Sequence, residues 1–343
     1  MAFSEIYVDP SIAGDSGAGT IGDPYGDLEY AIEQVTFDTT NGTRFNIKAG
    51  TAEIVVANLY TATQDTGTSI AYVTSATAPL VFQGYTATAG DGGVGELDAN
   101  AQNISIYSSN DDYIHFIDLK CHNTGNQPII DVDRQCNVIR CDIYNSSSGV
   151  NGFIAGLTSN VIGCHIYNVR KTSLQGFISH CYIDTTAAAS PIVGALIGGG
   201  FGCSFVNNIV VVSGVADGIQ ISSGAICVMN NSIYSSSSSS NVGLELNTNI
   251  NGAVITGNII EGFTTNYKLD TSGVTLISFG GNASYNAGTT EYTTTNAVDL
   301  WKDTGNETLI ASAFTSAATG DFSPVDTGLV KEGTVPESIG NGA

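Results

Sequence analysis

Six short segments in the middle of the chain share one pattern, and this pattern decides the fold. They read Cys141-Asp142-Ile143-Tyr144, Cys164-His165-Ile166-Tyr167, Cys181-Tyr182-Ile183-Asp184, Asn207-Asn208-Ile209-Val210, Asn231-Ser232-Ile233-Tyr234 and Gly257-Asn258-Ile259-Ile260. Aligned on one apolar residue, the anchors are Leu119, Ile143, Ile166, Ile183, Ile209, Ile233 and Ile259, at intervals of 24, 23, 17, 26, 24 and 26 residues. A repeat of this length is typical of a solenoid.

The residues around each anchor alternate in character as in a strand. An inward anchor places the residue two positions before it inward as well, and its direct neighbours outward. The predicted inward residues are Cys141, Cys164, Cys181, Asn207 and Asn231. We expect the thiols to act as small apolar residues in an interior column, and the two asparagines to form an amide ladder. Cys203 and Cys227 each precede an anchor by six residues and are expected to stack as a second pair.

Composition and repeat length together indicate the fold class. The chain has 41 Gly and 12% charged residues, which suits an all-β protein better than one with long surface helices. The uneven intervals favour a right-handed parallel β-helix with corner loops of different lengths, in about ten coils. We expect a single such solenoid with an N-terminal cap (1–42, helix near 27–36 after Asp27), coils (43–284) and an irregular C-terminal cap (285–343).

The charge restricts the partners. There are 32 acidic residues and ten Lys and Arg, a formal charge of −22, which disfavours nucleic acid and anionic membranes. No positively charged and apolar leader precedes Glu5-Ile6-Tyr7-Val8, so we expect no signal peptide. No cofactor is expected. Acidic loops around Asp15, Asp23 and Asp91 leave calcium open, although none follows a twelve-residue calcium-loop pattern.

Motifs near the N-terminus resemble a known family. Tyr7-Val8-Asp9-Pro10, Asp23-Pro24-Tyr25 and Lys48-Ala49-Gly50-Thr51 are similar to the opening of the pectate-lyase-like right-handed β-helix proteins, and Asp321 to Gly328 resembles their closing segment. The resemblance covers essentially the whole chain and implies the fold. It says little about activity, because this superfamily includes lyases, hydrolases, epimerases and non-enzymatic virion proteins.

Two outward columns are the candidate functional residues. If the protein is an enzyme, converging carboxylates are the signature of glycoside hydrolysis, and the predicted catalytic residues are Asp118, Asp142, His165, Asp131, Asp133 and Arg134. A companion column could bind a sugar or dock a protein, because Tyr is favoured at contacts. The predicted binding residues are Lys120, Tyr144, Tyr167, Tyr182 and Tyr234, with Asp184 in the same strip. The alternative is that these are ordinary polar residues of solvent-facing strands.

The first functional hypothesis is non-enzymatic. We expect a bacteriophage structural protein, a capsid decoration or fibre-like component on the virion surface, assembled in the bacterial cytoplasm. Its expected partners are further copies of itself and a major capsid or tail protein. The alternatives are a polysaccharide lyase or glycoside hydrolase, as in phage tailspikes, or a passive module that binds a host-surface glycan.

Overall fold

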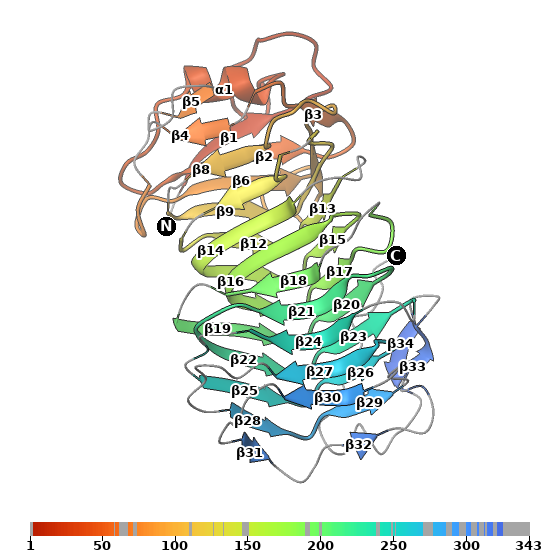
Figure 1. Ribbon diagram of the computed structural model, residues 1–343. Helices are drawn as coiled ribbons and strands as arrows, with labels where there is room; N and C mark the ends of the chain where they lie inside the picture. The colour runs from red at the N-terminus through yellow and green to blue at the C-terminus, as the bar shows by residue number, and fades with distance from the viewer. Residues whose placement is uncertain are drawn as a thin grey trace. The chain divides into compact units, whose positions relative to one another are not determined.

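The computed structural model shows a chain built almost entirely of strands (Figure 1). It describes residues 3–57, 59–61, 68–70, 74–109, 112–125, 127–132, 134–145, 151–188, 193–198, 201–237, 241–247, 250, 252–269, 277–285, 290–294, 300–302, 307–308, 312, 314–317 and 321–324. By its internal contacts the chain divides into two compact units, Met1–Ile166 and Tyr167–Ala343. The helix in the described part of the chain is too short to span a membrane.

The first unit begins with one strand and one helix. The helix α1 (Leu28–Gln34) starts at Asp27, whose carboxylate accepts a hydrogen bond from Tyr30 N at 2.7 Å. Leu28, Ala31 and Ile32 are buried, as their helical spacing predicted. Figure 1 shows α1 beside β1 (Ser4–Val8), at the N-terminal end of this unit. The expected helix near 27–36 is therefore confirmed.

Most coils consist of three short strands, and in β14 and β16 the first two are joined into one longer strand. The coil strands pair in parallel with the equivalent strands of the next coil. We call them the first, second and third sides of a coil. In the first unit the third side consists of β3 (Ala52–Ile54), β7 (Gly95–Asp98), β10 (Leu119–His122), β13 (Asp142–Tyr144) and β15 (His165–Tyr167, ending in the second unit). The other strands of this unit are β2 (Thr43–Lys48), β4 (Leu59–Thr61), β5 (Thr68–Ile70), β6 (Leu80–Tyr85), β8 (Tyr107–Ser109), β9 (Ile114–Ile117), β11 (Ile130–Val132), β12 (Asn137–Ile139) and β14 (Asn151–Ile162).

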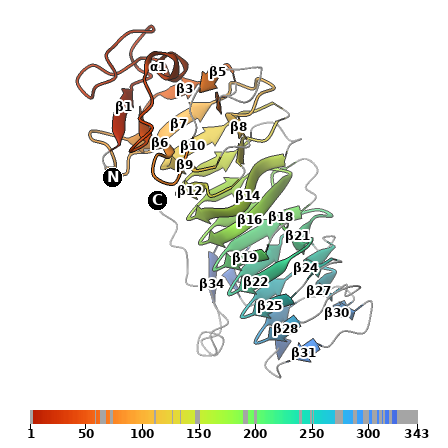
Figure 2. The same cartoon turned by 90° about the vertical axis from the view of Figure 1, so that its left-hand side faces the viewer.

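The second unit repeats the same plan, and Figure 2 shows its second-side strands β19, β22, β25 and β28 one beneath another. Its first and second sides are β16 (Lys171–Ser179), β18 (Val193–Ile197), β19 (Phe201–Val206), β21 (Asp217–Ile221), β22 (Ala225–Met229), β24 (Val242–Leu246), β25 (Gly252–Thr256), β27 (Thr265–Leu269), β28 (Ile277–Gly280), β30 (Thr290–Thr294) and β31 (Leu300–Lys302). Its third side is β17 (Tyr182–Asp184), β20 (Ile209–Val212), β23 (Ser232–Ser235), β26 (Ile259–Glu261), β29 (Ala283–Tyr285) and β32 (Glu307–Thr308).

The all-β parallel β-helix fold is thus confirmed. The predicted boundaries at residues 42 and 284 stay a prediction, although coil strands continue to Thr308.

From the coil of β9 and β10 onwards, a single residue with left-handed backbone separates the second and third sides. In the first unit these are Asp118, Arg140 and Gly163, with φ of 54°, 51° and 63°. In the second unit they are His180, Asn207, Asn230, Gly257 and Gly281, with φ between 55° and 67°. One left-handed residue reverses the direction of the strand sharply, which Gly and Asn tolerate best. The residue after this turn points into the coil.

An asparagine ladder forms at this inward position in the second unit. Asn208 Nδ2 donates to Asn231 Oδ1 at 3.2 Å, Asn231 Nδ2 to Asn258 Oδ1 at 2.9 Å, and Asn258 Nδ2 to Asn282 Oδ1 at 3.0 Å. All four side chains are buried. The ladder was expected at Asn207 and Asn231, and the prediction is wrong for Asn207, which is the half-buried left-handed turn residue.

The predicted apolar file is correct for some anchors and shifted for others. In the second unit the interior third-side file is Ile183, Val210, Ile233 and Ile260, which pair in register. Ile209 and Ile259 pair with Tyr182 and Ser232 instead and lie one position off this file. In strands a slip of one residue moves a side chain to the opposite face. The file prediction is therefore wrong for these two residues.

The first unit shows a shift of two residues. Ile143 pairs with Cys121 rather than with the predicted anchor Leu119, which is buried but two positions away. The thiols Cys141, Cys164 and, in the second unit, Cys181 are buried as predicted. Cys203 pairs with Ile226, and Cys227 pairs with Ser204, so the expected stacking of these two cysteines is wrong.

The shifted residues Ile209 and Ile259 are covered by the C-terminal segment. Phe314 and Ala317 pack on a cluster with Ile209, Val211, Ile259 and Ala283, next to the half-buried Tyr182 and Tyr234. This segment contains the antiparallel pair β33 (Phe314–Ser316) and β34 (Asp321–Pro324). Ser312 Oγ also donates to Glu261 Oε2 at 2.9 Å. The outer face of this side is therefore closed in the second unit.

The ladder gives a first prediction. Asn231→Ala removes the acceptor of Asn208 N (2.9 Å) and the donor to Phe205 O (3.0 Å), both in the interior. Because buried polar groups lose their partners, we expect a loss of about 2–3 kcal/mol in the free energy of unfolding, measured by urea titration. The control is Asn207→Gly, which keeps the left-handed turn and should change stability little. An equal loss in both variants contradicts the role of the ladder.

A buried carboxyl below α1 gives a second prediction. Glu53 Oε1 accepts a hydrogen bond from Leu28 N at 3.0 Å, and desolvation raises the pKa of Glu53 from 4.5 to about 8, with Asp27 and Glu29 adding to the rise. Its carboxyl therefore favours the folded state below pH 4.5, and this contribution is lost as the pH rises towards 8.

We expect Glu53→Gln, which stays neutral, to flatten this part of the dependence of Tm on pH. Its Tm should exceed that of the parent protein at pH 8.5 and approach it at pH 5. The exposed Glu33→Gln is the control and should follow the parent protein. Parallel Tm profiles for Glu53→Gln and the parent protein contradict the assignment.

Candidate functional site

The outward face of the third side in the first unit carries two columns of polar side chains. Register pairs Lys120 with Glu96 on β7 and with Asp142 on β13. The same pairing aligns His122 with Asp98 and with Tyr144. The residues between the columns, Leu97, Cys121 and Ile143, are buried in the coil. The two columns therefore form one surface of six chemically active side chains.

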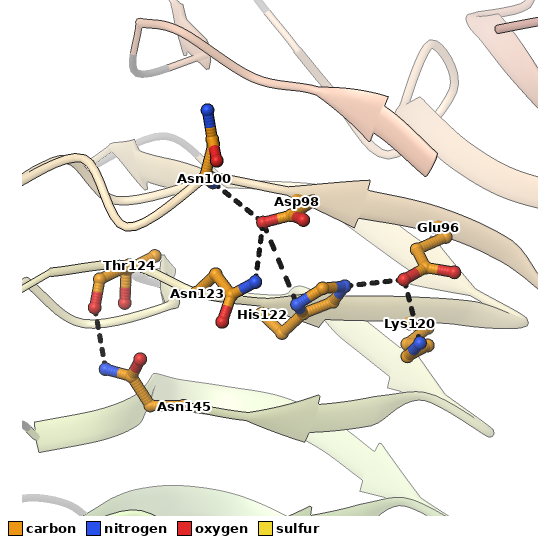
Figure 3. Close-up of polar contacts among 8 residues, drawn as sticks. All are labelled: Glu96, Asp98, Asn100, Lys120, His122, Asn123, Thr124 and Asn145. Carbon is orange, nitrogen blue, oxygen red and sulfur yellow. Dashed lines mark hydrogen bonds and ion pairs between the residues drawn. The ribbon is translucent and has the colours of Figure 1, made fainter. Parts of the chain in front are cut away.

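Glu96 is the centre of this surface. Its Oε1 accepts hydrogen bonds from Lys120 Nζ and from His122 Nε2, both at 2.7 Å (Figure 3). Desolvation raises the pKa of Glu96, but these two partners outweigh it and hold the pKa below its ordinary range. Burial also lowers the pKa of Lys120, and the bonds to Glu96 and Tyr144 more than reverse this. At neutral pH Glu96 is therefore ionised and Lys120 protonated.

His122 lies between two carboxylates and against an aromatic ring. Figure 3 shows its ring between Glu96 and Asp98. Its Nδ1 is 3.8 Å from Asp98 Oδ1 and has no hydrogen-bond partner, although the side chain is only 6% exposed. The ring stacks on Tyr144 with centroids 4.7 Å apart and an interplanar angle of 7°. Asp98 is itself held by Asn100 N and by Asn123 Nδ2, at 2.7 and 2.9 Å. The imidazole is thus held by the hydrogen bond to Glu96 and by stacking on Tyr144.

Asp142 is the second carboxyl of the Lys120 column. It is about half exposed, and His165 Nδ1 lies 3.8 Å from its Oδ1. Desolvation raises the pKa of Asp142, and the opposing effects of His165 and Lys120 are smaller. The predicted candidates Asp142 and His165 therefore do lie together. One column holds an ionised carboxylate and a carboxyl that retains its proton more readily.

Asp118 does not belong to this column. It was predicted at the same outward offset as Asp142, but it is the left-handed turn residue and lies before the third side. Its side chain is 6% exposed, and its carboxylate accepts two hydrogen bonds from Arg140, the next turn residue, at 2.6 and 2.7 Å. This pair joins successive turns. The prediction for Asp118 is wrong because the alignment was shifted by two residues.

The other predicted residues lie elsewhere. Asp131 is on β11, on another side of the coil from β13, and Arg134 follows that strand with its side chain exposed. Asp133 lies outside the described residues. Lys120 belongs to the Asp142 column rather than to that of Tyr144, although its Nζ is 5.6 Å from the Tyr144 ring centroid. Tyr167 opens the second unit, where Asp184 ends β17, and Tyr182 and Tyr234 pack beside the C-terminal segment. A binding role for these tyrosines stays a prediction.

Sequence reasoning missed Glu96, Asp98 and His122. The signal was present in the alternation of Glu96-Leu97-Asp98 and Lys120-Cys121-His122, which have the same outward-inward-outward form as Asp142-Ile143-Tyr144. Alignment on Leu119 instead of Cys121 concealed it. Cys121 is small, so it did not stand out as an anchor.

A smaller polar cluster lies in the second unit. Gln220 Nε2 donates to Glu245 Oε2 at 2.9 Å, and Lys268 Nζ bonds the other oxygen of that carboxylate. Nearby, desolvation raises the pKa of Asp217 to about 6, although Val242 N donates to it. No aromatic platform adjoins these residues among the described contacts. No group of three possible metal-ligating side chains occurs among the described residues.

The loop carboxylate Asp91, considered for calcium, is engaged by the backbone. It accepts hydrogen bonds from Thr86 N, Ala87 N, Thr88 N and Gly93 N at 2.6–3.1 Å. These bonds hold the pKa of Asp91 far below its ordinary range. Its place in the fold is therefore to organise the loop between β6 and β7.

The fold and this site can be set beside known proteins. No family model and no curated protein matches the chain. Among solved structures, pectate lyase Pel9A matches with a TM-score of 0.64 and 17% identity, over 98% of this chain and 88% of that one. The selenomethionine derivative of the GH136 lacto-N-biosidase from Eubacterium ramulus matches with a TM-score of 0.57 and 11% identity, over 89% of this chain and 68% of that one. Such likeness shows the fold, which is the pectate-lyase-like parallel β-helix.

The ion pair between Glu96 and Lys120 gives a third prediction. Lys120→Met removes the cation that lowers the pKa of Glu96, so we expect this pKa to rise. The measurement is an NMR titration of the side-chain carboxyl of Glu96. Lys120→Arg keeps the charge and is the control, with a much smaller change. A Glu96 pKa that does not move in Lys120→Met contradicts the ion pair.

Proposed function

We propose that the protein is a carbohydrate-active enzyme that hydrolyses glycosidic bonds on the outward face of β7, β10 and β13. The observation that carries the proposal is that Glu96 and Asp142 lie in one column, on either side of Lys120. They share one exposed column, and their surroundings shift their pKa in opposite directions. Glycoside hydrolysis needs two carboxyl groups whose surroundings push their pKa values apart.

An inverting reaction is the one that we propose for these two carboxyl groups. They stand on strands two rungs apart, with Lys120 on the strand between them, so their Cα atoms are about 9.6 Å from each other. Inverting glycosidases separate the two carboxyl groups by about 6.5–9.5 Å, which leaves room for a water molecule beside the sugar. Glu96 takes a proton from this water as the oxygen of the water attacks the anomeric carbon. The glycosidic C–O bond breaks, and Asp142 gives its proton to the leaving oxygen.

The surrounding residues support these roles. Lys120 and His122 both bond Glu96 and therefore position it as a base. Because the pKa of Lys120 is raised, its amine is protonated and unsuited to remove the proton that β-elimination requires. The half-buried ring of Tyr144, fixed by stacking on His122, offers a flat apolar surface for a sugar ring. The protonated state of Lys120 therefore favours hydrolysis over elimination.

The structural neighbours are in line with a glycan substrate. One is a pectate lyase and the other a lacto-N-biosidase, and both share only the fold with this chain. They support a carbohydrate-active role more than a purely structural one.

A fourth prediction tests the activity. On a glycan panel, Asp142→Asn and Glu96→Gln should each lower kcat by about a hundredfold or more, because one loses the acid and the other the base. Activity should decline as the pH rises through the raised pKa of Asp142 and as it falls through the lowered pKa of Glu96. NMR of the first product should show an inverted anomer.

The control variant is Asp217→Asn, which changes a carboxyl with a raised pKa in the other polar cluster. It should keep full activity. Hydrolysis that persists in both Asp142→Asn and Glu96→Gln contradicts the assignment of these residues.

A role in a bacteriophage particle stays a second proposal, with capsid or tail protein and further copies of the chain as partners. The cross-rung ion pairs and the amide ladder supply the rigidity that such a component needs. A glycan-cleaving virion spike would combine both roles. Mass spectrometry of purified particles tests this proposal, and absence of the chain from particles of a phage that encodes it overturns it.

A further inference from the structure

The charge of the proposed site narrows the kind of glycan that it can accept. Its outward side chains include three carboxyl groups, Glu96, Asp98 and Asp142, and one Lys. The single ammonium of Lys120 is 2.7 Å from Glu96 and is neutralised there. An anionic sugar that approaches the two columns therefore meets at least one carboxylate without a Lys partner. The ammonium of Lys120 is already paired with Glu96.

The same pairing of cations recurs through the described chain. Each of five basic residues bonds a carboxylate on a neighbouring rung or turn. The pairs are Arg44 with Glu5, Lys48 with Asp9, Lys120 with Glu96, Arg140 with Asp118, and Lys268 with Glu245. The chain has ten Lys and Arg in all against 32 acidic residues. At least five of its ten cations are thus engaged in ion pairs within the described residues, and the net charge makes the field around the chain negative.

A polyuronate carries one carboxylate on every sugar. Such a group is repelled by a site carboxylate, and the repulsion is several times stronger at the effective dielectric near a protein surface than in water. A neutral sugar has no such cost. Its hydroxyl groups are donors, and ionised carboxylates are acceptors only, so the two are complementary. Stacking of a sugar face on an aromatic ring such as Tyr144 does not depend on the charge of the sugar.

From this we infer that the substrate is an uncharged glycan rather than a polyuronate. The inference rests on the proposed function, since it concerns the same surface around Glu96, Lys120 and Tyr144. It separates the substrate of this chain from the polyuronate that the name of its pectate lyase neighbour indicates.

The test compares glycans that differ only in charge. Polygalacturonate and alginate are each paired with their carboxyl-reduced forms, in which every uronate is a neutral hexose in the same linkage. Galactan, mannan and β-glucan extend the neutral set. Binding is measured by affinity electrophoresis and turnover by release of reducing ends, with and without CaCl2. We expect binding and turnover only among neutral polymers, at least tenfold above any uronate partner.

Preference for a uronate polymer over its reduced form overturns the inference and leaves the proposed function standing. If no polymer of either kind is bound or cleaved, the proposed function itself fails, and the inference fails with it. The two failures are therefore distinct.

A set of variants tests the physical cause by binding alone. Glu96→Gln removes one negative charge and releases the ammonium of Lys120, so polygalacturonate should bind about twofold to fivefold more tightly at low salt. The gain should disappear at 0.5 M NaCl, where charges are screened. The double variant Glu96→Gln/Lys120→Met has no released cation and should lose the gain. An equal gain in the double variant contradicts the assigned role of Lys120.

Discussion

The structure depends on the in-register stacking of rungs through parallel backbone hydrogen bonds. Each third-side strand repeats the position of its neighbour, so Glu96, Lys120 and Asp142 stand above one another at rung spacing. The left-handed residues Asp118 and Arg140 before β10 and β13 turn the chain at equivalent points of successive coils and so keep this register. An outward side chain therefore has a fixed neighbour from a distant part of the sequence. Functional surfaces on this fold are columns.

Inside the coil, the same stacking requires each buried polar group to find its partner on the next rung. The ladder from Asn208 to Asn282 meets this requirement, since Asn208, Asn231 and Asn258 each donate to the asparagine of the next rung, and Asn282 donates to backbone carbonyls. Outside the coil, the stacking places like charges side by side unless signs alternate. Glu96 and Lys120 alternate, as do Asp118 and Arg140 in the turns. Ion pairs across rungs or turns thus engage at least five of the ten Lys and Arg residues.

The two outer faces of the third side differ between the units. In the first unit the face carries Glu96, Lys120, His122 and Asp142, with Asp142 about half exposed. In the second unit the face includes the apolar residues Ile209 and Ile259, and the C-terminal segment packs on them through Phe314 and Ala317. The third side therefore presents polar side chains in the first unit, whereas in the second unit part of it serves for packing. Alternation alone cannot distinguish them, because Ile209 looks like an interior residue in the sequence.

The sequence by itself determined the fold class, the capping helix at Leu28–Gln34 and the buried thiols of Cys141 and Cys164, because repeat length and alternation are local properties. It also indicated a part of the site, Asp142 with His165. Only the tertiary structure decided the register, and with it the positions of Glu96, His122 and Asn208. The coil lengths vary, and the side-chain period of a strand is two, so an error of one residue exchanges inside for outside and an error of two changes every cross-rung neighbour.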